Sequence, residues 1–268
     1  MSKYVVERNH KREKLDRGQY KDIQKMHNRL KNVSSYSELF GDRLIGNRID
    51  SLISLHNIPY SVIEKRINYV IEIFESNGYS EKDAINFIIN NPNIIECGLT
   101  QIKINYILLK TIVKDTNVNV VEFISKKSKI KTNSSIVIDR KNDSVLLTKP
   151  ASLHGVYNVI CDMFIINGYD QNDINSYLIK NTELLKIPFN LFVSRLAILN
   201  VVNMLDTIFF EHPDLINENI SDRQLFEQYA KTSTNDMNYA EFSNFVETLK
   251  NDFISKLTND REMKLMRK

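Results

Sequence analysis

The side chains in this sequence whose grouping best suits a chemical task are lysines and arginines, and the task is binding phosphate. Cationic groups arranged on one face displace the counterions of a nucleic-acid backbone. The densest group is Lys126, Lys127, Lys129 and Lys131, followed in a polar turn by Arg140 and Lys141. We predict that this group contacts nucleic acid. An exposed basic turn without a partner is the alternative interpretation.

A second set of cations lies on segments that are expected to be helices, each of which follows a turn of one recurring type. The set is Lys103, Lys110, Arg195 and Arg223. Equivalent placement in successive helices would build a basic stripe, and we include these residues among the predicted nucleic-acid contacts. Acidic residues such as Glu64, Asp222 and Glu227 are interspersed, so a solvated amphipathic face explains this set nearly as well.

Metal and catalytic chemistry lack the spacings that they require. The five histidines are scattered, and no two stand one helical turn apart as zinc-binding histidines do. A run from Asp115 matches the start of a calcium loop, but Val120 occupies its glycine position and Lys126 its glutamate position. No phosphate loop, nucleophile elbow or dinucleotide fingerprint occurs. We therefore expect no metal, cofactor, small-molecule substrate or enzymatic activity.

The composition favours an all-α protein. Of 268 residues, 42% are hydrophobic and 26% charged, with only 7 Gly and 5 Pro, a profile that favours long helices. The net charge of +3 is too small to indicate nucleic acid by itself. Two cysteines cannot form a disulfide framework, and no apolar run reaches the roughly 18 residues of a membrane span. We expect a cytoplasmic location and no membrane partner.

Changes in composition along the chain predict three parts. Residues 1–33 form a basic N-terminal arm, flexible or helical, residues 34–231 form a helical-repeat domain, and residues 232–268 form a C-terminal helical extension. Within the repeat domain, apolar spacing with Gly and Pro at the breaks predicts short helices joined by tight turns. Near 135–147, two β-branched runs flank a polar turn. We interpret them as a small β-hairpin insert, with a degenerate helical repeat as the alternative.

Two long segments of the chain are related by a shift of 90 residues without a gap, which places Gly78 on Gly168 (168 − 78 = 90). Seven further identities accompany this pair: Asn68, Phe74, Asn77, Tyr79, Asp83, Ile89 and Asn91 fall on Asn158, Phe164, Asn167, Tyr169, Asp173, Ile179 and Asn181. Shorter echoes begin at Phe123 and His212. The elementary unit is about 30 to 36 residues, a length that holds two or three short stacked helices.

The run Gly78–Ile95, GYSEKDAINFIINNPNII, resembles the repeat of the mitochondrial transcription termination factor (mTERF) family. Units of that family open with Gly, an apolar residue and Ser or Asp, continue as an acidic, apolar-periodic helix, and end at Pro and an apolar pair. Gly168–Leu185 and His212–Ile216 are similar to it again. The resemblance implies a curved superhelix (solenoid) of helical triplets, whose concave basic surface binds double-stranded DNA or RNA without chemistry or a cofactor.

The residues and the resemblance together predict a nucleic-acid-binding helical-repeat protein. Duplex DNA is the favoured partner and structured RNA the other. The expected role is non-enzymatic, in transcription regulation or termination or in replication. The alternative function is a protein-binding α-solenoid scaffold or adaptor, because solenoids also bind proteins on their concave face. A continuous basic stripe would favour nucleic acid, and an apolar groove would favour a protein.

Overall fold

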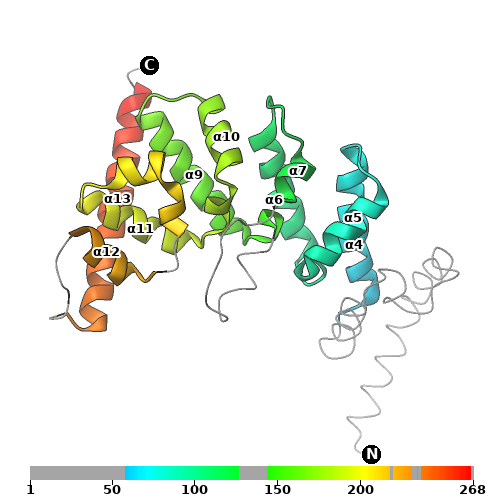
Figure 1. Cartoon of the computed structure of the whole chain (residues 1–268), viewed down its shortest axis with the longest axis horizontal. Helices are drawn as coiled ribbons and strands as arrows, with labels where there is room; N and C mark the ends of the chain where they lie inside the picture. Colours follow the sequence, from blue (N-terminus) through cyan, green and yellow to red (C-terminus); the bar gives the residue numbers. More distant parts are fainter. Residues whose placement is uncertain (1–57, 127–143, 218–219, 231–233, 235–236, 267–268) are drawn as a thin grey trace, which may run out of the picture. The chain divides into compact units, whose positions relative to one another are not determined.

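Every regular element in the described part of the chain is helical (Figure 1). The computed structural model describes residues 58–126, 144–217, 220–230, 234 and 237–266. Within these ranges there is no strand, which confirms the expected all-α class. The chain divides into two units, Met1–Leu99 and Thr100–Lys268. The division lies inside the range predicted as one repeat domain, and the predicted N-terminal arm lies outside the described residues.

The described part of the first unit contains two α-helices and a 3-10 helix. They are α4 (Tyr60–Ser76), α5 (Glu81–Asn90) and η1 (Pro92–Ile95). The turn after α4 uses Gly78 at φ +85°, a left-handed conformation that favours glycine. A capping box starts α5, in which Ser80 Oγ accepts from the Asp83 N–H and the Asp83 carboxylate accepts from the Ser80 N–H. Pro92, which lacks an N–H, suits the first position of η1.

The second unit contains the remaining described elements. In chain order they are α6 (Leu99–Val113), α7 (Val120–Ile124), η2 (Val145–Leu147), α9 (Pro150–Ile166), α10 (Gln171–Lys180), η3 (Thr182–Lys186), α11 (Phe189–Val201), η4 (Thr207–Glu211), η5 (Pro213–Asn217), α12 (Asp222–Ala230) and α13 (Tyr239–Met266). η4 is a π-helical segment, whereas η2, η3 and η5 are 3-10 helices.

The bounds of the helices confirm the 90-residue repeat. α9 begins and ends 90 residues after α4 (150 − 60 = 90; 166 − 76 = 90), and α10 is related to α5 in the same way (171 − 81 = 90; 180 − 90 = 90). Gly168 repeats the left-handed turn with φ +86°. Among the described elements, the order α-helix, α-helix, 3-10 helix recurs in α4–α5–η1, α6–α7–η2 and α9–α10–η3, with residues 127–143 between α7 and η2 lying outside the described part. In α11–η4–η5 the π-helical segment takes the second position.

In three of these triplets, a polar side chain at the seventh position of the first helix binds the 3-10 helix of the same triplet. Each side chain donates a hydrogen bond to the carbonyl oxygen of the second residue in the apolar pair of its own 3-10 helix, and this second residue is buried in all three cases. The donor and acceptor pairs are Arg66 with Ile95, Asn105 with Leu146, and Arg195 with Ile216. Val156 occupies the same position in α9. The recurring bond satisfies a carbonyl that burial removes from water.

The predicted β-hairpin near 135–147 is wrong in its second half, because Val145–Leu147 forms the 3-10 helix η2. Ser144 Oγ accepts from the Leu146 N–H at 3.2 Å. Side-chain amides of two α6 residues donate to the carbonyls of η2. These bonds occupy backbone groups that a strand would pair with its neighbour. The first half of the predicted hairpin lies outside the described residues.

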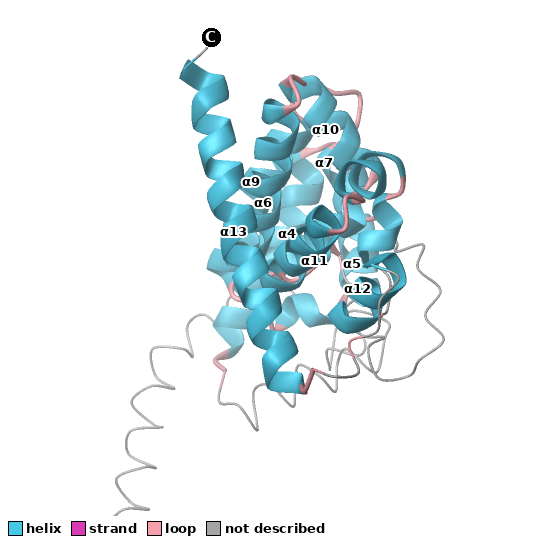
Figure 2. Cartoon of the chain, turned by 90° about the vertical axis from the view of Figure 1, so that its left-hand side faces the viewer, coloured by secondary structure: helices cyan, strands magenta, loops and turns pink. Residues whose placement is uncertain are grey.

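The C-terminal helix α13 packs along α9 and α11 within the second unit (Figure 2). Its buried residues are Phe242, Val246, Phe253 and Leu257, and their spacing of about one or two helical turns forms a single apolar seam. Arg261 of α13 extends this contact by an ion pair with Asp162 of α9, with Nε 3.0 Å from Oδ1. Because α12 and α13 both cover α11, every residue of α11 from Phe192 to Leu199 is buried.

Candidate nucleic-acid interface

α6 buries one face and presents the opposite face to solvent. Its exposed positions recur every three or four residues, which places them in one stripe along the helix. They are Thr100, Lys103, Ile104, Ile107, Lys110 and Thr111, followed by the exposed Lys114 just after the helix. We call these seven residues the α6 stripe.

The buried face of α6 fixes the backbone from which the stripe projects. Ile102, Leu109 and Ile112 are fully buried, and burial of each such side chain stabilises the fold by about 1.5–3 kcal/mol. Asn105 is also fully buried, and its Nδ2 donates to the Thr148 carbonyl at 2.6 Å. The exposed side chains of the stripe are therefore carried on an anchored helix.

The α6 stripe is positively charged and contains no carboxylate. It carries three lysines, and α6 has no Asp or Glu along its whole length. Among the described α-helices, each other helix with a partly or fully exposed Lys or Arg also carries an acidic residue. A helix that carries lysines and no carboxylate of its own suits a surface that attracts phosphates. Lys103 and Lys110 from the predicted set thus share one surface.

Lys126, the described member of the densest predicted group, is exposed and lies two residues after the end of α7. Its Nζ donates to the carbonyl oxygen of Ile179 in the last turn of α10 at 2.6 Å, and lies 6.0 Å from the centroid of the Phe123 ring. A cation at a helix C-terminus is favourable because the carbonyl ends carry partial negative charge. Lys126 therefore links α7 to α10. Its remaining two N–H groups are donors that a phosphate can accept from.

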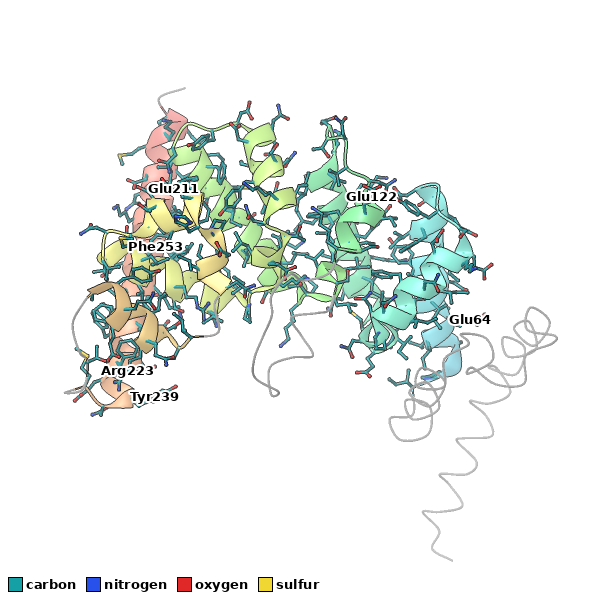
Figure 3. All side chains as sticks on the ribbon, viewed as in Figure 1. Glu64, Glu122, Glu211, Arg223, Tyr239 and Phe253 are labelled. Atoms are coloured by element: carbon teal, nitrogen blue, oxygen red, sulfur yellow. The ribbon has the colours of Figure 1, made fainter. Side chains whose placement is uncertain are left out.

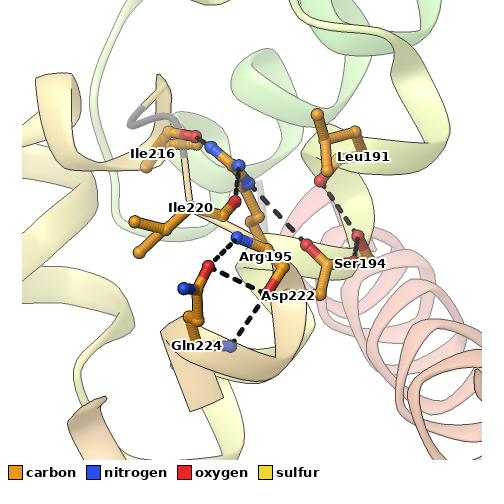
Figure 4. Close-up of polar contacts among 8 residues, drawn as sticks. Leu191, Ser194, Arg195, Ile216, Ile220, Asp222 and Gln224 are labelled. Atoms are coloured by element: carbon orange, nitrogen blue, oxygen red, sulfur yellow. Dashed lines mark hydrogen bonds and ion pairs between the residues drawn. The ribbon is translucent and has the colours of Figure 1, made fainter. Parts of the chain in front are cut away.

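Arg195 lies in the interior and is 4% exposed, and Figure 4 shows its polar contacts. Its Nη1 donates to the Ile216 carbonyl and its Nη2 donates to the Ile220 carbonyl at 2.7 Å. Its Nε lies 3.8 Å from Oδ1 of Asp222, a separation that makes an ion pair without a hydrogen bond. Asp222 Oδ2 also accepts from Ser194 Oγ at 2.7 Å. This guanidinium holds α11 to the segment before α12, so we leave Arg195 out of the proposed interface.

Arg223 of α12, which is labelled in Figure 3, is partly buried and binds the backbone just before α13. Its Nη2 donates to the carbonyl of Met237 at 2.7 Å. Its Cζ lies 5.1 Å from the centroid of the Phe242 ring, within the range of a cation–π interaction. Arg223 is therefore also engaged in the fold, and we leave it out of the proposed interface. The other predicted cations lie outside the described residues: Lys127, Lys129, Lys131, Arg140 and Lys141.

Five members of the α6 stripe were not singled out by the sequence patterns, namely Lys114, the two isoleucines Ile104 and Ile107, and the threonines Thr100 and Thr111. Lys114 and the isoleucines Ile104 and Ile107 belong to the surface, and the two isoleucines are 39% and 65% exposed. The signal that was present is the absence of any acidic residue from Leu99 to Lys114. The sequence pattern could not identify the isoleucines as exposed, because α6 contains so many apolar residues that hydrophobicity does not distinguish its solvent face.

The described residues give little support for metal binding or for catalysis by a nucleophilic side chain. They contain no group of three or more His, Cys, Asp and Glu side chains that could hold a metal ion. Burial raises the pKa of Cys97 and of Cys161 to about 11, so both thiols are protonated and weakly nucleophilic near neutral pH. Burial also raises the pKa of Tyr177 far above its usual value. None of the helices that the structure describes is long and apolar enough to cross a membrane.

The fold and this surface together define an all-α protein made of recurring helical triplets, with an acid-free basic stripe on one helix. No family model, curated protein or solved structure matches the chain. The functional argument therefore rests on the chain's own geometry and charge.

Proposed function

We propose that this chain is a nucleic-acid-binding helical-repeat protein that binds duplex DNA through the α6 stripe. The observation that supports this proposal is the set of exposed lysines on an anchored helix without a carboxylate. Lysines on one face gain affinity from releasing the counterions condensed on phosphates. The proposed role is non-enzymatic, in transcription regulation or termination or in replication.

The recurring order of α-helix, α-helix and 3-10 helix supports a second part of the proposal. We propose that the triplets stack into a curved superhelix of the kind that the resemblance to the mTERF family implies. The recurring bond from the seventh residue of the first helix to its 3-10 helix supports this as well, because it is a regular feature of the units themselves. Regular units of this kind stack on their neighbours.

The experiment that tests the proposal is binding to a labelled DNA duplex, measured by fluorescence anisotropy across a salt series. The double variant Lys110→Glu/Lys114→Glu should bind at least about tenfold more weakly than the wild type. The salt slope should fall by about 2, because each phosphate contact contributes roughly 0.9. The matched control is Lys65→Glu/Lys256→Glu, which makes the same change in net charge at exposed positions on α4 and α13.

The control should bind within about threefold of the wild type, because neither of its lysines belongs to the α6 stripe and solvent-exposed charges outside the contact are largely screened by salt. Absence of wild-type binding to DNA at low salt would overturn the proposed function. Equal losses in the two double variants would show that net charge, and not the α6 stripe, governs binding.

The alternative function is a protein-binding scaffold or adaptor, and one observation favours it. Ile104 and Ile107 expose apolar surface on α6, and exposed apolar surface is common at protein-binding sites. A scaffold would lose its partner when these isoleucines are changed, but would show no salt-dependent binding to DNA. The anisotropy series therefore separates the two functions.

A further inference from the structure

Two large apolar side chains on the α6 stripe have no role in binding phosphate. Ile107 is 65% exposed and Ile104 is 39% exposed, and both lie among lysines. Exposed isoleucine side chains gain free energy when they leave water against another apolar group. A surface that recognised phosphates alone would gain more from polar residues at these positions. The isoleucines therefore indicate an apolar feature on the ligand.

The lysines and isoleucines occupy different edges of the stripe. With about 3.6 residues per turn, the three lysines follow one edge, Ile107 lies beside them, and Ile104 with Thr111 forms the other edge. Lys103 and Lys110 are about 10 Å apart along the helix axis at about 1.5 Å per residue. The B-DNA major groove is about 12 Å wide and accepts a helix. A helix lying in that groove has phosphates at its edge and base edges at its centre.

We infer that α6 enters the major groove of duplex DNA and that Ile107, with Ile104, contacts the 5-methyl groups of thymine. The inference rests on the proposed function and names its ligand more closely, as A·T-containing duplex DNA. The thymine methyl is the apolar group that the four natural base pairs present in this groove. RNA carries uracil, which lacks the methyl, and its A-form major groove is too deep and narrow for side chains to read.

A partner helix from another protein would also cover these isoleucines, and the three lysines on a helix without a carboxylate favour a polyanion over such a helix. The equivalent positions on α11 are Ser194 and Ala197 (194 − 104 = 90; 197 − 107 = 90), and they are 4% and 2% exposed. α12 and α13 pack against that helix. Small side chains at these positions allow helices to approach closely. The large isoleucines of α6 suit contact with flat base edges, and its lysines suit the neighbouring phosphates.

The test uses the full chain and two 24-base-pair duplexes, alternating d(A-T) and alternating d(A-U). These duplexes differ only in the thymine methyl. A helix bound at any position along the d(A-T) duplex meets a thymine methyl. The wild type should bind the uracil duplex about three- to tenfold more weakly, as expected for one or two lost methyl contacts. An alternating A-U RNA duplex should bind more weakly still at the same salt concentration.

Two variants assign the effect to α6. Ile107→Ala should abolish the preference for thymine while keeping the helicity and the salt slope of the wild type, because the side chain is exposed and uncharged. Val201→Ala removes a similar apolar group, 46% exposed on α11, and should keep the preference.

Binding of the two DNA duplexes with equal affinity would overturn this inference and leave the proposed function intact. A thymine preference that Ile107→Ala retains would overturn it too, and would make a protein partner the better explanation of the isoleucines. No binding to either duplex would overturn the proposed function itself.

Discussion

Replacing Arg195 by methionine should destabilise the second unit without weakening the binding of DNA by the folded protein. The change removes two charge-assisted hydrogen bonds to the carbonyls of Ile216 and Ile220, each of which contributes about 1.5–3 kcal/mol. Methionine fills a similar volume and removes a charge from the interior, which offsets part of this loss. The Asp222 side chain is 24% exposed, but Oδ1, the oxygen that faces Arg195, is buried without a hydrogen-bond partner, so the lost ion pair adds to the destabilisation. The expected net loss is about 2–4 kcal/mol.

The assay is thermal unfolding followed by circular dichroism. For a unit of this size, a loss of 2–4 kcal/mol should lower the Tm by about 5–15 °C. The control is Lys256→Met, an exposed cation on α13, which should change the Tm by about 2 °C at most. DNA binding is measured well below the lower Tm. An unchanged Tm together with lost affinity would refute the reasoning, because it would place the Arg195 guanidinium on the surface.

Two further predictions concern the packing of Gly155 and the capping box at the start of α5. Gly155→Ala should lower the unfolding free energy by about 1–3 kcal/mol in urea denaturation, because a Cβ there would lie 2.5 Å from the ring of Phe189. Gly98→Ala, where the added Cβ meets nothing within 4 Å, is its control, and an equal loss in both would contradict the packing argument. Hydrogen bonds from Ser80 lower the pKa of Asp83, so the capping box is fully stabilising above the ordinary pKa of about 4 and loses this contribution as the pH falls below it. The Tm difference between the wild type and Ser80→Ala should therefore shrink between about pH 7 and pH 3, and a constant difference over that range would rule out the carboxylate's contribution.

The local structure of the repeats followed from the sequence because its causes lie within a few residues. Gly78 marks a left-handed turn, Ser80 and Asp83 form a capping box, and Pro92 begins a 3-10 helix. Each of these features depends on the φ preference of one residue or on a hydrogen bond across three positions. The same short-range signals recur 90 residues later, so the second set of helix bounds was predictable from the first.

The segment Val145–Leu147 shows where local reasoning failed. A short apolar run with β-branched residues is compatible with a strand or with a helical turn. The decision came from Gln101 and Asn105, whose side-chain amides donate to the carbonyls of this segment from more than forty residues away. No pattern within the segment contains that information.

In the candidate site, too, the sequence determines one part of the result and the tertiary structure another. The sequence by itself determined that α6 has lysines and no carboxylate, and that Lys110 and Arg195 each lie on a helix after a turn of the same type. Tertiary packing decided that one cation faces solvent and the other is buried. α12 and α13 cover α11, so its arginine must satisfy buried carbonyls, whereas α6 keeps an uncovered face on which Lys110 stays hydrated. A cation's function depends on which groups surround it, and those groups are contributed by helices distant in the chain.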